Sequence, residues 1–135
     1  MTKSQRQHGL LDTCVLIDLE EIDPGSLPVV AAVPAVALAE LAQGVAMARD
    51  PVKILARSQR LADIEAEFET KPFDRAAARR YGTLVALIIQ AGREPRARHL
   101  DLMIAATAAA NDLPLYTRNV DDFKGLEQGV EVIGV

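Results

Sequence analysis

The chain is poor in cysteine and histidine: it has one cysteine and two histidines in 135 residues. Because a single cysteine cannot form an internal disulfide, Cys14 indicates a reducing compartment. His8 and His99 lie far apart in the sequence and make no zinc site of the usual kind, so we expect both at the surface. The chain also lacks a Ser-His-Asp set, a Walker loop and a dinucleotide fingerprint, which removes the common motif-bearing enzyme classes.

Long hydrophobic runs are absent as well. The most apolar stretch, residues 28–47, is interrupted by Pro34, Glu40 and Gln43, whereas a membrane-spanning helix needs about 20 apolar residues in a row. Residues 1–9 are polar, and no signal peptide follows them. These absences predict a cytoplasmic protein that makes no contact with a membrane.

A basic excess, typical of proteins whose whole surface grips nucleic acid, is missing too. The formal net charge is −4 at pH 7, and the sequence pI is about 5.1. Acidic metal ligands enter this sum as negative although a bound ion neutralises them. The arginines of the second half of the chain are Arg75, Arg79, Arg80, Arg93, Arg96, Arg98 and Arg118. Charge alone therefore does not decide the partner.

What the sequence does contain is three isolated carboxylates in apolar surroundings. Asp12 follows Leu10-Leu11, Glu40 stands within residues 38–42, and Asp101 precedes Leu-Met-Ile-Ala-Ala. A charge on a core-facing element loses its hydration and needs a partner. A further polar group, Asn119, Asp121 and Asp122, follows near the C-terminus. Carboxylates on separate elements that need a common positive partner are typical of a divalent-cation site.

Strand and helix patterns alternate along the chain, with no linker or repeat. We expect strands at 8–12, 29–32, 70–73, 115–117 and 130–133, and helices at 13–19, 34–49, 52–68, 75–91 and 100–111, with a short helical turn near residue 121. In the helix over 52–68, Ile54, Leu55, Leu61 and Ile64 are predicted to face inward. Asp74 suits an N-cap and Gly92 a helix end. The pattern predicts one α/β domain over residues 1–135, a three-layer sandwich with a central, mostly parallel sheet.

This layout gives the carboxylates a common location. Asp12 would end the first strand and Asn119 would follow a later one, and ligands of open parallel sheets bind beyond the carboxyl ends of the strands. Asp101 falls in the first turn of its helix, where the helix dipole favours the ionised form. Glu40 lies in mid-helix on a side chain long enough to reach the same place.

Simpler interpretations exist for each residue. Asp12 and Asp101 would also suit helix caps, and Glu40 would suit an ion pair with an arginine such as Arg93. Asp121 and Asp122 would suit a solvated loop. Other enzyme classes fit less well: a phosphatase of the haloacid-dehalogenase type needs an aspartate at position 14, and a receiver domain needs a lysine where Arg118 stands.

Four segments together resemble a known family: residues 11–17 (LDTCVLI), 39–44 (AELAQG), 101–108 (DLMIAATA) and 116–123 (YTRNVDDF). Their order and spacing resemble the PIN-domain ribonucleases and, among these, the VapC toxins of type II toxin–antitoxin pairs. The resemblance implies a homodimer, an acidic site for Mg²⁺ or Mn²⁺, a VapB-type antitoxin as partner, and endonuclease cleavage of structured RNA. A catalytically inactive module that only binds a partner protein is the alternative.

Carried over residue by residue, the resemblance predicts a site made of Asp12, Glu40, Asp101, Asn119 and Asp121, with Asp12 and Asp101 as direct metal ligands. Glu40 would bind the ion through water or orient the attacking water. Thr117 would position a carboxylate or a phosphate, and Arg118 would contact the RNA backbone. Two positions depart from the family: Cys14 stands where serine is frequent, with an effect expected on packing alone, and Asn119 supplies no charge. We therefore expect Asp121, more than Asp122, to turn inward.

Overall fold

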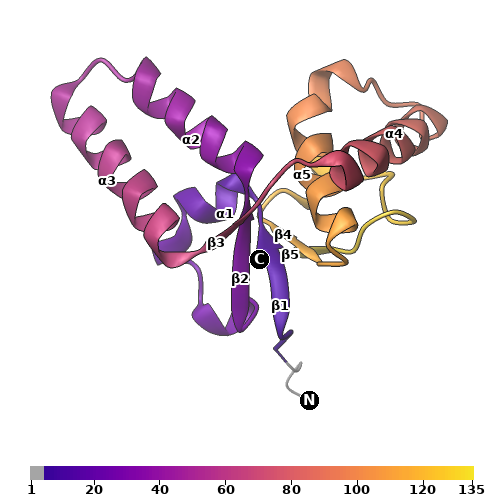
Figure 1. The fold of residues 1–135 in the computed structure, drawn as a ribbon, viewed down its shortest axis with the longest axis horizontal. Coiled ribbons are helices and arrows are strands. Elements are labelled where there is room, and N and C mark those ends of the chain that lie inside the picture. Colours follow the sequence, from indigo (N-terminus) through magenta and orange to yellow (C-terminus); the bar gives the residue numbers. More distant parts are fainter. Residues whose placement is uncertain (1–4) are drawn as a thin grey trace.

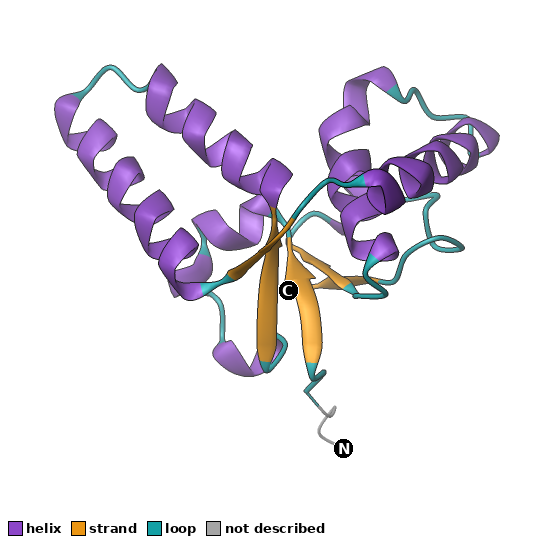
Figure 2. Ribbon diagram, viewed as in Figure 1, coloured by secondary structure: helices purple, strands orange, loops and turns teal. Residues whose placement is uncertain are grey.

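A computed structural model describes residues 5–135 as five parallel strands between two layers of helices (Figures 1 and 2). The strands are β1 (His8–Leu11), β2 (Val30–Pro34), β3 (Glu69–Lys71), β4 (Leu115–Thr117) and β5 (Val132–Gly134). The main helices are α1 (Thr13–Ile17), α2 (Ala35–Met47), α3 (Pro51–Glu67), α4 (Arg75–Gln90) and α5 (His99–Ala110). In the described chain the strand order is β3-β2-β1-β4-β5 and every pairing is parallel. The predicted α/β sandwich is confirmed.

Strand β1 occupies the centre of the sheet and separates two hydrophobic cores. Leu10 pairs in register with Ala32 of β2 and with Leu115 of β4. Successive side chains of a strand point to opposite faces, so Leu10 enters the core under α4 and α5 while Leu11 enters the core under α1, α2 and α3. Both leucines are fully buried, as expected for a parallel sheet that is covered on both sides.

Helices α4 and α5 form the layer at the right of Figure 1. Helix α5 is apolar on nearly all sides, and most of its residues from Leu102 to Ala109 are buried, as expected for a helix inside a core. Asp74 accepts a hydrogen bond from the backbone N–H of Ala77 at 3.0 Å and caps α4. Gly92 follows α4 with a φ of 76°, a left-handed conformation that glycine adopts without strain. The predicted cap and helix end are confirmed.

Helices α2 and α3 form an antiparallel pair at the left of Figure 1 and extend beyond the edge of the sheet. Ile64 of α3 is buried against the sheet, but Ile54 and Leu55 are 37% and 71% exposed. The prediction that these two face inward is wrong, because the N-terminal half of α3 lies outside the core, where every residue from 51 to 60 is exposed. The spacing of apolar residues identified the helix but not which part of it reaches the sheet.

Two boundaries also differ from the sequence-based expectation. Pro34 ends β2 and precedes α2, rather than forming the first turn of that helix. Strand β2 begins at Val30, and its buried part is Ala32 to Pro34, whereas Val29 and Val30 are exposed. Among residues 5–135, no helix combines the length and the apolar character needed to span a bilayer.

Candidate active site

Asp12 lies directly beyond the carboxyl end of β1, at the N-cap of the short helix α1. It is 6% exposed, and its carboxylate accepts three hydrogen bonds. Oδ1 accepts from the backbone N–H of Thr13 at 2.8 Å, and Oδ2 accepts from Thr117 Oγ1 at 2.8 Å and from Cys14 Sγ at 3.2 Å. A carboxylate offers about four acceptor positions, so Asp12 caps its helix and still keeps acceptor capacity on Oδ1.

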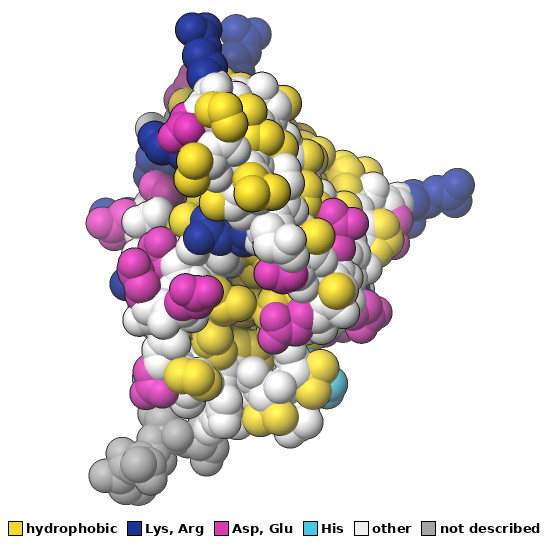
Figure 3. All heavy atoms as spheres, turned by 90° about the vertical axis from the view of Figure 1, so that its left-hand side faces the viewer, with side chains coloured by type: hydrophobic (Ala, Val, Ile, Leu, Met, Phe, Trp, Pro, Cys, Tyr) yellow, Lys and Arg dark blue, Asp and Glu magenta, His cyan; other side chains and the backbone are white. Residues whose placement is uncertain are grey.

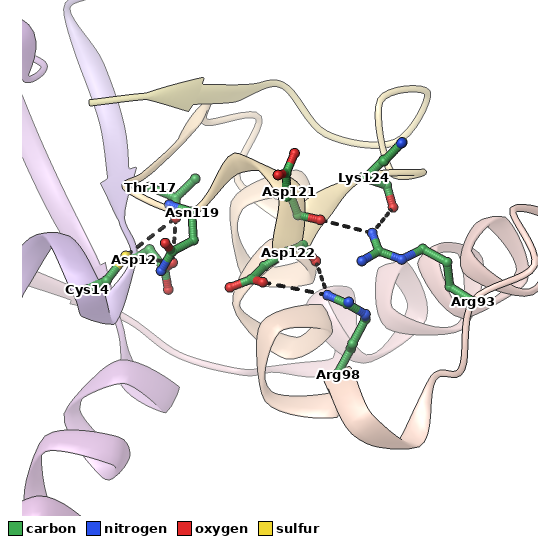
Figure 4. Close-up of polar contacts among 9 residues, drawn as sticks. All are labelled: Asp12, Cys14, Arg93, Arg98, Thr117, Asn119, Asp121, Asp122 and Lys124. Atoms are coloured by element: carbon green, nitrogen blue, oxygen red, sulfur yellow. Dashed lines mark hydrogen bonds and ion pairs between the residues drawn. The ribbon is translucent and has the colours of Figure 1, made fainter.

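Thr117, the last residue of β4, ties the two strand ends together. Strands β1 and β4 are neighbours in the sheet, so their carboxyl ends meet, and the buried Thr117 hydroxyl reaches Asp12. The same hydroxyl oxygen accepts a hydrogen bond from the backbone N–H of Asn119 at 3.0 Å. Figure 4 shows Asn119 beside Thr117 and Asp12. The prediction that Thr117 positions a carboxylate agrees with this contact.

Glu40 reaches the site from the middle of α2 and is half-buried. Its Oε1 accepts a hydrogen bond from the hydroxyl of Thr13 at 2.8 Å. The alternative ion pair with Arg93 is not formed, because that arginine binds backbone carbonyls near residue 121. Thr13 therefore links two of the expected site carboxylates: its N–H binds Asp12 and its hydroxyl binds Glu40. One feature of the sequence could have identified Thr13: it is a hydroxyl residue directly after the first isolated aspartate.

Asp101 occupies the first turn of α5, as expected, but the helix dipole does not decide its protonation. Burial, followed by the charges of Asp12, Asp122 and Glu40, raises the pKa of Asp101 to about 6, while Arg98 acts in the opposite direction. Within residues 5–135, no hydrogen bond or ion pair engages its carboxylate, and the helix lacks a side-chain cap. The alternative role of Asp101 as a cap is therefore not seen.

The segment after β4 forms the short 3₁₀ helix η4 (Val120–Phe123). Figure 4 shows the carboxylate of Asp122 pointing toward Asp12, and that of Asp121 pointing away. Asp121 is exposed, whereas Asp122 is partly buried and contributes to the raised pKa of Asp101. The geometry thus runs against the expectation that Asp121 turns inward in preference to Asp122, because η4 directs successive side chains to different sides.

The four carboxylates Asp12, Glu40, Asp101 and Asp122, here called the acidic cluster, share an electrostatic environment rather than a closed shell. Within residues 5–135, no three Asp, Glu, His or Cys side chains converge closely enough to hold one ion. The donor chemistry nevertheless fits a hard divalent cation, which prefers carboxylate oxygens. Like charges that raise the pKa of a partly buried acid are relieved by a cation, so the donor chemistry of these residues suits such an ion although they form no closed coordination shell.

Cys14 takes a larger part in the site than its expected effect on packing. Its thiol donates to Asp12 Oδ2, lies 3.4 Å from Thr117 Oγ1, and accepts from the backbone N–H of Arg118 at 3.4 Å. Burial, more than the nearby charge of Asp12, raises the pKa of the Cys14 thiol. The guanidinium of Arg118 pairs instead with Asp18 at 3.1 Å and with Glu21 at 3.5 Å.

The structure is a parallel α/β sandwich with one buried aspartate, Asp12, directly beyond the carboxyl end of its central strand and partly buried acids from α2, α5 and η4 around it. The family model of the PIN domain matches residues 9–127 of this chain, and the chain belongs to the PIN-domain family. The order of the four segments at residues 11–17, 39–44, 101–108 and 116–123 thus identified the family correctly.

Individual relatives place the chain more finely. It is 42% identical over 134 residues to "Ribonuclease VapC5" of Mycobacterium tuberculosis, covering 94% of this chain and 95% of that protein. A crystal structure of the toxin–antitoxin system VapBC-5 from M. tuberculosis superposes with a TM-score of 0.84 at 37% identity, covering 96% of this chain and 99% of the other. FitAcB from Neisseria gonorrhoeae follows with a TM-score of 0.72 at 27% identity, covering 93% and 96%. The predicted VapC kinship is confirmed.

Proposed function

We propose that this chain is a Mg²⁺- or Mn²⁺-dependent endoribonuclease that acts as the toxin of a bacterial toxin–antitoxin pair in the cytoplasm. The relatives named VapC5 and VapBC-5 support the nuclease and toxin part of the proposal. The observation that carries metal dependence is Asp101, an acid whose pKa rises to about 6 among three other carboxylates. Strongly perturbed acids that face several charged neighbours are typical of functional sites.

Asp12 and Asp101 would hold the ion. Asp12 is fixed by three hydrogen bonds, and Asp101 has no competing donor in residues 5–135 that would have to be displaced. Glu40, which Thr13 holds by a single oxygen, keeps its second oxygen for orienting the attacking water. Asn119 and Asp122 complete the rim at the η4 side. The Asp121 side chain is assigned no direct contact, in contrast to the sequence-based expectation.

A bound divalent ion supplies Lewis-acid stabilisation of the phosphate and lowers the pKa of water bound to it. The protein's own contribution is positioning: Thr117 and Cys14 fix the orientation of Asp12, and Thr13 fixes Glu40 relative to it. Such prearranged groups remove the need for reorganisation during phosphodiester hydrolysis.

The decisive experiment incubates the purified protein with structured RNA in the presence of Mg²⁺ or Mn²⁺, with and without a chelator. We expect cleavage that the chelator abolishes and that Asp12→Asn eliminates. Mapping of RNA ends after a brief pulse of expression then identifies the substrate among transfer, ribosomal and messenger RNA. A wild-type protein that binds its antitoxin but cleaves none of these with either metal is the inactive binding module instead.

The proposed partner is a VapB-type antitoxin. Figure 3, which views the side formed by α2 and α3, shows hydrophobic side chains gathered above a group of acidic ones. The exposed apolar residues of this region are Met47, Val52, Ile54 and Leu55. They would pack against the antitoxin, while an arginine of its tail would enter the acidic cluster, since guanidinium matches carboxylates in bidentate geometry.

Co-purification followed by an activity assay tests this partner. We expect cleavage to fall in proportion to the complex formed, and a purified one-to-one complex with undiminished cleavage would remove inhibition from the proposal. The toxin itself is proposed to be a homodimer, which light scattering of the purified protein would measure directly.

A further inference from the structure

Two arginines from the segment between α4 and α5 hold η4 in place. Arg93 donates from Nη1 to the carbonyl of Asp121 at 3.0 Å and to that of Lys124 at 2.7 Å. Arg98 donates from Nη1 to the carbonyl of Asp122 at 3.0 Å, and the same nitrogen lies 3.8 Å from Asp122 Oδ1. Figure 4 shows both guanidinium groups approaching η4 from the side opposite Asp12. We call Arg93 and Arg98 the arginine clamp.

The turn is short, so donors from outside it matter for its position. At its two ends, the N–H of Asp122 donates to the carbonyl of Asn119 at 3.0 Å and the N–H of Lys124 donates to that of Asp121 at 3.3 Å. Short 3₁₀ helices have poor hydrogen-bond geometry and weak intrinsic stability. Charged donors make stronger hydrogen bonds than neutral ones. The clamp therefore sets where η4 lies relative to α5, the helix that carries Asp101.

The two clamp residues differ in their relation to the acidic cluster. Arg93 binds backbone carbonyls, with no carboxylate of the cluster among its bonded partners. Arg98 contacts Asp122 through both its carbonyl and its carboxylate, and its charge acts on Asp101. Its side chain is 27% exposed, so the guanidinium is only partly screened by water.

We propose that Arg98 is a positioning residue of the nuclease site, which holds the Asp122 carboxylate toward Asp12 and within the acidic cluster. The inference rests on the proposed metal-dependent nuclease and adds to it the residue that makes the fourth carboxylate available. The role assigned to Arg98 is to hold Asp122 through Nη1; no contact with RNA is assigned to it. Its loss would free η4 and weaken the site for the ion.

Arg98→Ala is compared with Arg96→Ala, a matched control that removes the same charge two residues away from an exposed side chain. The first readout is thermal unfolding of the purified protein during titration with Mn²⁺ alone, without RNA. We expect Arg98→Ala to raise the Mn²⁺ concentration for the half-maximal shift about tenfold, since partners that orient ligands commonly affect metal affinity by that much. Arg96→Ala should leave it within twofold of the wild-type protein.

The second readout is a double-mutant cycle with Asp122→Asn. If Arg98 acts through Asp122, Arg98→Ala weakens Mn²⁺ binding little further in the Asp122→Asn background, because contacting residues show non-additive effects. A purely structural role would instead give additive losses and overturn the proposal. Equal Mn²⁺ midpoints for Arg98→Ala and the wild type would overturn it as well.

Two further measurements keep the outcome decisive. If Arg98→Ala does not fold, Arg98→Met, which keeps a long side chain but has no donor for the Asp122 carbonyl, replaces it, and an unchanged Mn²⁺ midpoint in this variant counts against the proposal. RNA cleavage is measured separately. A wild type that binds Mn²⁺ but cleaves no RNA refutes the nuclease, while the thermal titration still decides the role of Arg98. A wild type indifferent to Mn²⁺ refutes both.

Discussion

Asp12 and Asp101 are held in their places by opposite means. Asp12, at the end of a central strand, is buried and accepts three hydrogen bonds from residues of α1 and β4. Asp101, in the first turn of α5, is held by its helix alone and carries a pKa raised to about 6 by burial and by three neighbouring carboxylates. One carboxylate is oriented by donors, whereas the other is destabilised as an anion and gains most from a cation.

This difference gives the two halves of the site, the side of β1 and β4 and the side of α5 and η4, distinct physical roles. The side of β1 and β4 holds the Asp12 carboxylate in a fixed geometry in the absence of an ion, so its removal should destabilise the fold. The side of α5 and η4 supplies charge, so its neutralisation should relieve the metal-free protein. In the proposed site each half would supply a ligand to the ion, so the two halves would be alike in function and opposite in their effect on stability.

The largest expected effect is loss of activity on neutralising either aspartate. Asp12→Asn and Asp101→Asn should both reduce RNA cleavage to the level of the chelated wild type, because an amide is a poorer ligand for a hard cation. Their metal-free melting temperatures should move in opposite directions: Asp12→Asn falls because donors lose an acceptor, and Asp101→Asn rises because repulsion is relieved. Activity assays and thermal unfolding of the two variants test this prediction. Melting temperatures that shift in the same direction would contradict the opposite effects of Asp12 and Asp101 on stability.

The next effect is stabilisation by the ion. At an Mg²⁺ or Mn²⁺ concentration about 100 times its dissociation constant, binding to the folded state alone adds about 2.7 kcal/mol. We expect the melting temperature of the wild type to rise by several degrees, and Asp12→Asn to blunt that rise. Differential scanning fluorimetry measures both, with Ca²⁺ and high ionic strength as controls for screening. A wild-type curve unaffected by either metal would argue against the acidic cluster as its binding site.

The two aspartates of η4 sharpen the comparison further. Asp122→Ala should lower cleavage about tenfold, as is common for groups that support a metal site, because Asp122 belongs to the acidic cluster. Asp121→Ala serves as the matched control, since it removes the same charge from an exposed side chain pointing away from Asp12. Both are assayed at equal ionic strength. The reverse order would restore the sequence-based assignment of Asp121.

A smaller effect is expected from pH. The folded-state pKa of Asp101 lies near 6, above the ordinary value of 3.8, so between these values the folded protein binds a proton that the unfolded chain has released. Stability from this group therefore increases as pH falls from 7 to 5 and is lost as pH rises through 6. Without metal, the melting temperature of the wild type should be higher at pH 5 than at pH 7. This difference should be larger in the wild type than in Asp101→Asn, and equal differences would contradict the raised pKa of Asp101.

The smallest effect concerns the thiol beside Asp12. Cys14→Ser replaces a weak S–H donor by a hydroxyl of similar shape, and we expect cleavage to stay within about fivefold of wild type, because a neutral hydrogen bond contributes about 1 kcal/mol. Cys14→Ala, which removes the donor altogether, should lower activity more than Cys14→Ser. Steady-state assays at saturating Mn²⁺ compare the three proteins. If serine is the more damaging substitution, the contact with Asp12 is not a supporting one.

Hydrophobic periodicity predicted much of the fold, and the isolated charges predicted part of the site. Asp12 and Asp101 stood out because a lone carboxylate among apolar residues is costly, and the structure places Asp12 at a strand end and Asp101 in a helical first turn as expected. Ile54 and Leu55 were misplaced because their spacing also suits an exposed helix pair that extends past the sheet.

The contacts that hold η4 in place could not be predicted from the spacing of residues in the sequence. Whether Asp121 or Asp122 faces the site depends on the rotation of η4, which Arg93 and Arg98 set from a segment more than twenty residues earlier in the sequence. Arg98 gave no signal of its own, since it stands in a run of arginines and other polar residues that is typical of a solvated loop. The helix dipole was expected to favour the ionised form of Asp101, but burial and the like charges of the acidic cluster outweigh it and raise the pKa of Asp101.

The hydrogen bonds around Asp12 have a direction, and that direction constrains the chemistry. The backbone N–H of Asn119 points at the Thr117 hydroxyl, whose only proton points at Asp12 Oδ2. In parallel, the N–H of Arg118 points at the Cys14 sulfur, whose proton points at the same oxygen. Both relays end on the carboxylate, so each proton of the pair is already committed. Rotation of the Asp12 carboxylate about its Cβ–Cγ bond would break both of these hydrogen bonds at once, so the two relays determine that Oδ1 is the oxygen that keeps free acceptor positions.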